Sequence, residues 1–109
     1  MANKSQTSGG LVDFSITVSA AWQRVLPEDN TRGALELMNA GANNMGLYWA
    51  PLGNNKTVPT PTGIGSKGVF TLVPTGSFEP AGGFIPTNEL WVIGTASDNF
   101  TCMSTKAPS

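Results

Sequence analysis

The chain has 109 residues, the length of one domain, and three Trp and five Phe supply large apolar side chains for one core. Six basic and seven acidic residues give a net charge of −1, and the sequence lacks the clustered Lys and Arg that nucleic-acid binding requires. The chain has no histidine and one cysteine. We therefore expect no zinc or iron site, no cysteine–histidine catalysis and no internal disulfide.

The first segment, Met1–Gly10, is small and polar, and we expect it to form a flexible arm. It lacks the apolar region of a signal peptide, and no segment of the chain has the length and hydropathy of a transmembrane helix. The sequence therefore predicts a protein made in a cytoplasm, without a membrane partner. The remaining residues, 11–109, are expected to form one domain.

Alternating apolar and polar residues predict the first strands. Phe, Ile and Val alternate with polar residues over Asp13–Val18, and Trp22–Leu26 is expected as a second strand that ends at Pro27. Arg32–Asn39 has some helical propensity, but its alternation and the turns on both sides favour a strand. The next strand is expected over Met45–Ala50, with Leu47 and Trp49 on one face and Tyr48 on the other.

Pro51–Lys67 is the longest irregular segment, and long loops of this kind are usually functional or disordered. Further short strands are expected over Val69–Val73, Ser77–Glu79, Leu90–Gly94 and Asn99–Met103. Short strands at regular spacing are typical of an antiparallel sandwich or barrel. The sequence predicts an all-β fold, a single antiparallel, jelly-roll-like β-sandwich of about seven or eight short strands.

No set of residues has the spacing of a catalytic or metal site. Turn caps and solvated faces are the preferred interpretation of the carboxylates, and a Ca²⁺ site at Glu28–Asn30 is disfavoured because the spaced ligands of an EF-hand are missing. The glycines of Thr62–Gly68 and Ala81–Gly83 lack the P-loop pattern. We expect no enzymatic activity and no cofactor, and we expect Cys102 to be a small buried residue.

Three further sets of side chains are candidates for binding a partner or a ligand. For Arg32, one interpretation is a contact with an anion or a partner. The other, which we favour, is that Arg32 packs its stem on the sheet edge and donates to loop carbonyls. The Trp residues are platforms for sugars or parts of the core, and the strand patterns favour the core for Trp49 and Trp91. Phe84 and Ile85 lie in a glycine-flanked loop, where an apolar tip is a candidate interface.

Four segments of the sequence together resemble small virion proteins of tailed bacteriophages: NTRGALELMN, GLYWAP, LVPTGSFEP and IPTNELWVIGTAS. The resemblance covers about Pro27 to Met103, although the Pro51–Lys67 loop is long for the pattern and the arm has no counterpart. It implies a capsid decoration (cement) protein that binds the outer head surface and stabilises the lattice of the major capsid protein. The alternative is a tail or fibre module that binds a host surface glycan.

The resemblance implies two partners, the major capsid protein and further copies of this chain in a dimer or trimer. It places the protein on the capsid surface after assembly in the bacterial cytoplasm. The expected contact residues lie in the arm, the long loop and the apolar loop tip. They are Asn3, Lys4, Gln6, Lys56, Val58, Ile64, Phe84 and Ile85.

Overall fold

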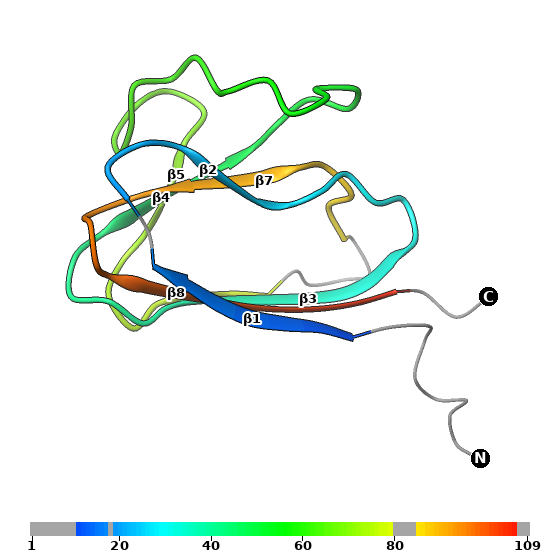
Figure 1. Ribbon diagram of the computed structural model, residues 1–109, viewed down its shortest axis with the longest axis horizontal. Helices are drawn as coiled ribbons and strands as arrows, with labels where there is room; N and C mark the ends of the chain where they lie inside the picture. The colour runs from blue at the N-terminus through cyan, green and yellow to red at the C-terminus, as the bar shows by residue number, and fades with distance from the viewer. Residues whose placement is uncertain (1–10, 18, 80–84, 107–109) are drawn as a thin grey trace.

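The computed structural model describes residues 11–17, 19–79 and 85–106, which form eight strands in two antiparallel four-stranded sheets. Sheet 1 has the order β1 (Leu11–Thr17), β8 (Asn99–Lys106), β3 (Arg32–Asn39) and β6 (Ser77–Phe78). Sheet 2 has the order β2 (Gln23–Leu26), β7 (Leu90–Ile93), β4 (Met45–Trp49) and β5 (Phe70–Leu72). The two sheets stack face to face (Figure 1). The predicted all-β sandwich is confirmed.

The core lies between the sheets because each strand turns alternate residues inward. In β3, Leu35 and Leu37 are buried while Glu36 is exposed. Leu37 is paired with Cys102 of β8, and opposite residues of an antiparallel pair share a face. Cys102 is therefore part of the core and is 0% exposed, as predicted. Residues of both sheets complete this cluster: Leu26, Met45, Leu47, Leu72, Leu90, Val92 and Phe100.

Sheet 2 is covered on both faces, which explains the continuous apolar run of β7. Leu90 and Val92 point into the core, so Trp91 and Ile93 lie on the outer face of the sheet, where both are also buried. The long loop over residues 51–69 runs along this outer face (Figure 1, green). Trp91 is buried as predicted, but beneath the loop rather than between the sheets.

The predicted strands match the observed ones closely where alternation is strict. Arg32–Asn39 is a strand with the predicted bounds. β8 continues to Lys106, beyond the predicted end at Met103, because it is the inner strand that pairs with β1 on one side and β3 on the other. The segment from 51 to 67 is irregular, as predicted. The arm over residues 1–10 and the Ala81–Gly83 glycines lie outside the described residues.

Candidate functional site: an open groove between two edge strands

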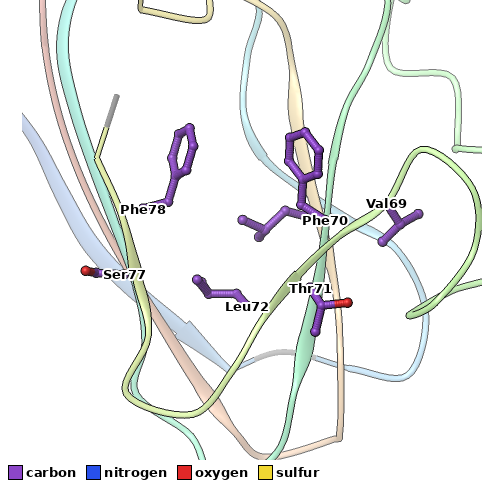
Figure 2. A pocket seen from close by; sticks show the side chains of 7 residues that line it. Val69, Phe70, Thr71, Leu72, Ser77 and Phe78 are labelled. Atoms are coloured by element: carbon purple, nitrogen blue, oxygen red, sulfur yellow. The ribbon is translucent and has the colours of Figure 1, made fainter. Parts of the chain in front are cut away.

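A groove opens where the two sheets end on the same side of the sandwich. β5 is the last strand of sheet 2 and β6 is the last strand of sheet 1. The space between them has a volume of about 530 Å³. We call it the edge groove, and it is lined by Leu47, Val69, Phe70, Thr71, Leu72, Ser77 and Phe78. Figure 2 shows the rings of Phe70 and Phe78 on either side of this space, with Leu72 below and between them.

Two phenylalanines occupy inner-face positions in this groove. Phe70 is paired with Leu47, and Phe78 is paired with Leu37, and both leucines belong to the core. Each phenylalanine therefore points toward the space between the sheets. Phe70 is nevertheless 58% exposed. A ring on the inner face of a sandwich is normally buried by the opposite sheet, so the sandwich does not close at this edge.

The floor of the groove is held by aromatic packing and by a fixed turn. The rings of Phe78 and Trp49 lie 6.1 Å apart with an interplanar angle of 49°. In the turn after β5, the Gly76 amide donates to the carbonyl of Val73 over 2.8 Å. The side chain of Asn39 in β3 reaches across to donate to the carbonyl of Leu72 in β5, also over 2.8 Å. These bonds fix the position of β5 relative to sheet 1.

The backbone beside the groove is only partly paired. β5 covers β4 from Met45 to Leu47, and β6 covers β3 only at Leu37 and Met38. In the described part of the chain, no strand lies beyond β5 or β6. Unpaired edge strands are templates for pairing with another chain. The groove thus combines apolar inner-face side chains with open backbone edges.

A second shallow cavity of about 300 Å³ lies beside β6 on the outer face of sheet 1. Its lining includes the exposed side chains of Met38 and Met103 and shares Ser77 with the edge groove. Apolar surface therefore flanks β6 on both sides. Neither cavity lining brings acid, base and nucleophile together, and within the described residues no group of three or more His, Cys, Asp or Glu side chains could hold a metal ion.

Arg32 is buried at the far end of β3 and has a structural role. Its guanidinium donates to the carbonyl of Pro27 over 2.6 Å, to Pro86 over 2.6 Å and to Asn88 over 3.3 Å. Burial lowers the pKa of Arg32 below its ordinary value, although Asp29 and Cys102 raise it in part. The favoured interpretation, in which Arg32 donates to loop carbonyls, is confirmed.

We expected the carboxylates to be solvated or to cap turns, but Glu89 is buried. The residue is 3% exposed. Oε1 accepts from Asn54 Nδ2 over 2.7 Å and from Trp91 Nε1 over 3.0 Å, and Oε2 accepts from the Lys56 amide over 2.9 Å. Desolvation raises the pKa of Glu89, but these hydrogen bonds and the Arg24 charge outweigh it, so the pKa lies below its ordinary value. Glu89 holds the long loop against sheet 2.

Of the predicted contact residues that the structure describes, none lines the edge groove. Val58 and Ile64 are exposed on the long loop, and the side chain of Lys56 is exposed while its backbone amide is bound to Glu89. Ile85 is partly buried and packs against the core, which corrects its expected place at an exposed apolar tip. The others lie outside the described residues: Asn3, Lys4, Gln6 and Phe84.

Sequence reasoning missed Phe70 and Phe78 as site residues. The available signal was a pair of aromatic residues at inward positions of two very short strands that follow each other along the chain. A short strand at the end of a sheet has few neighbours to cover its inward side chains. That signal depends on knowing that both strands are edges, which the strand order decides.

The comparisons with known proteins find likeness in one solved structure at the level of fold. No protein-family model matches the chain, and no curated protein matches it. The solved structure is described as "Bacillus endospore appendages form a novel family of disulfide-linked pili". It is superimposed with a TM-score of 0.53 at 11% identity, over 92% of this chain and 87% of that one. At this identity the likeness concerns the fold.

The function expected from the phage resemblance is corrected by this comparison. The structural neighbour is a pilus protein of Bacillus, and neither the head-decoration role nor the tail-module alternative finds a matching protein. The expectation of a capsid decoration protein is therefore wrong. The resemblance to phage virion proteins, the major capsid protein as a partner, the capsid location and the lack of enzymatic activity stay predictions. In the described residues, no helix is long and apolar enough to cross a membrane.

Proposed function

We propose that this chain is a structural subunit that assembles with further copies of itself through the edge groove. The observation that carries the proposal is Phe70, an inner-face ring that remains 58% exposed between two edge strands. A strand or apolar side chain of a second copy would bury this ring and pair with the open backbone edges. The groove lining contains no ionisable side chain, so such burial carries no charge penalty.

Two further observations support self-association. Charged residues make up 12% of the chain and the net charge is −1, so copies of the chain repel each other weakly. The fold is shared with a solved structure of a pilus, and a pilus is an assembly of many subunits. The proposed role is structural rather than catalytic.

The assembly proposed here differs in its linkage from the pili of that description. Those pili are disulfide-linked. The single cysteine of this chain, Cys102, is 0% exposed in the centre of the core. A sulfur in that position does not reach a second subunit while the sandwich is folded. The contacts between copies are therefore non-covalent.

The test is the oligomeric state of the full chain over a concentration series, measured by sedimentation velocity and light scattering. The wild type should form larger species as concentration rises, whereas Phe70→Ser should stay monomeric with an unchanged circular dichroism spectrum. Val58→Ser is the matched control, because Val58 is 60% exposed on the long loop and does not line the groove. A monomeric wild type at every concentration, or equal assembly of Phe70→Ser, would overturn the proposal.

A further inference from the structure

The long loop over residues 51–69, here called the strap, is tied at three places to residues that flank β2 and β7 of sheet 2. Near its start, Glu28 Oε1 accepts from the Gly53 amide over 2.7 Å. Next, Glu89 accepts from Asn54 and from the Lys56 amide. Farther along, Trp22 Nε1 donates to the carbonyl of Pro61 over 2.9 Å. Two of the three ties depend on a carboxylate, and the middle one is buried.

The strap covers an apolar surface that would otherwise meet solvent. Trp91 and Ile93 lie on the outer face of sheet 2 with exposures of 5% and 8%. Gly46 of β4 is paired with Ile93, and a Cβ at Gly46 would lie 3.3 Å from Ile64 Cγ1 and 2.9 Å from Val69 Cγ1, both from the strap. The strap therefore sits directly on the sheet here. Removing it would expose Trp91 and Ile93 together.

The hydrogen bonds of Glu89 require the ionised form of its carboxylate. Its two oxygens already face N–H groups from three neighbours, and Arg24 of β2 places Nη1 3.8 Å from Oε2. Among the described residues, Arg24 is the charged group that faces Glu89 from β2, and the strap contributes the amide of Lys56 and the side chain of Asn54. A protonated carboxyl would turn one acceptor oxygen into a donor that faces another donor.

We propose that the strap is an acid-released cover, in which protonation of Glu89 frees the strap and uncovers the Trp91–Ile93 surface of sheet 2. The proton comes from solvent and binds a carboxylate oxygen, and no covalent bond of the chain changes. The ties at Asn54 and Lys56 are lost together because they share that carboxylate. The two sheets keep their own hydrogen bonds, since Glu89 precedes β7 and protonation of its side chain leaves its backbone carbonyl free to accept from the Ala50 amide.

The experiment measures amide hydrogen exchange by mass spectrometry in the full chain, comparing strap peptides with peptides of β3 and β8. Glu89→Gln imitates the protonated state because one oxygen is replaced by a donor. At neutral pH its strap peptides should lose protection by roughly tenfold or more, because hydrogen bonds to a charged group are lost. Peptides of β3 and β8 should keep their protection. Glu36→Gln, which removes an exposed carboxylate from sheet 1, is the matched control and should exchange like the wild type.

Glu28→Gln separates the two carboxylates. Glu28 is exposed and ties only the Gly53 end, so its variant should loosen the start of the strap and leave the amide of Lys56 protected. Unchanged strap protection in Glu89→Gln would overturn the proposal. If Glu89→Gln does not fold, the wild type decides in a series of pH values that descends from 4.5, the ordinary value of a glutamate, until protection is lost. Loss of protection in the strap and in the sheets at the same pH overturns the proposal. Loss in the strap at a higher pH than in the sheets supports it.

Discussion

Phe70 and Phe78 occupy equivalent inner-face positions on the two edge strands, but Phe78 packs against Trp49 whereas Phe70 is mostly exposed. The difference predicts unequal effects on stability. Phe78→Ala should lower the free energy of unfolding by about 2–3 kcal/mol, since it removes a packed ring. Phe70→Ala should cost less than about 1 kcal/mol in the monomer. Urea denaturation of both variants, followed by tryptophan fluorescence, measures this contrast, and equal losses would contradict it.

Arg32 joins three loop carbonyls, and its removal should be costly. Arg32→Met leaves the carbonyls of Pro27, Pro86 and Asn88 without this donor in a buried position. We expect a loss of about 2–4 kcal/mol, because buried acceptors without donors carry their desolvation penalty. Arg32→Lys should recover only part of it, since one ammonium group does not reproduce the two branches of the guanidinium. Thermal and urea unfolding measure both variants. Full recovery by lysine would show that charge alone matters here.

Asn39 ties sheet 1 to sheet 2 beside the edge groove. Its Nδ2 donates to the carbonyls of Asn43 and Leu72, while its Oδ1 accepts from the Gly41 amide. Asn39→Ala should lower the free energy of unfolding by about 2–3 kcal/mol because these buried bonds are lost. Asn39→Asp should lose more at neutral pH than in mild acid, because its carboxylate would face two carbonyl oxygens. Denaturation at two pH values tests this, and a pH-independent loss would be the contrary result.

Gly46 allows the strap to approach sheet 2. A Cβ there would lie 2.9 Å from Val69 Cγ1 and 3.0 Å from Ile93 Cγ2, closer than a methyl group tolerates. Gly46→Val should therefore displace the strap and lower the free energy of unfolding by about 1–3 kcal/mol. Ala34→Val serves as the control, because it adds bulk at an exposed position of β3. Crystal structures and urea midpoints of both variants check this. An undisplaced strap in Gly46→Val would refute it.

The pKa of Glu89 predicts how stability depends on pH. Folding lowers this pKa below its ordinary value of 4.5, so the unfolded chain binds the proton more readily. The contribution of Glu89 is complete above 4.5 and is lost as the pH falls through the lower folded value. The free energy of unfolding should thus decline with pH in this acid range. Glu89→Gln should flatten the decline, which urea titrations at several pH values would measure, while Glu36→Gln should retain it.

The sandwich could be predicted because its strands alternate strongly. Leu35 and Leu37 in β3 are buried and Glu36 between them is exposed, so the alternation alone gives both the strand and its inner face. Cys102 and Trp91 were likewise predictable as buried side chains. What alternation does not contain is the order of strands in the sheets. The edge groove depends on that order. Phe70 is exposed because, among the described residues, no further strand lies beyond β5.

The buried carboxylate of Glu89 was missed for a different physical reason. In a strand with one solvated face, Glu89, Trp91 and Ile93 would share the solvated side, and a glutamate there needs no explanation. The signal that was present is the uninterrupted run Leu90–Ile93, which indicates a strand buried on both faces. A glutamate in phase with Trp91 is then buried too, and it requires partners. The strap supplies them from more than thirty positions earlier in the chain.

The position of β8 has a consequence for biosynthesis. This strand lies between β1 and β3 in sheet 1, yet it follows every other strand along the chain. During synthesis, β1 and β3 therefore cannot pair with β8 until Asn99–Lys106 has emerged from the ribosome. Pairings between distant segments form slowly, so the pairing of β8 with β1 and β3 is expected to be a late step of folding. A nascent chain without β8 has no finished sheet 1 and lacks the core side chains Phe100 and Cys102, which both belong to β8.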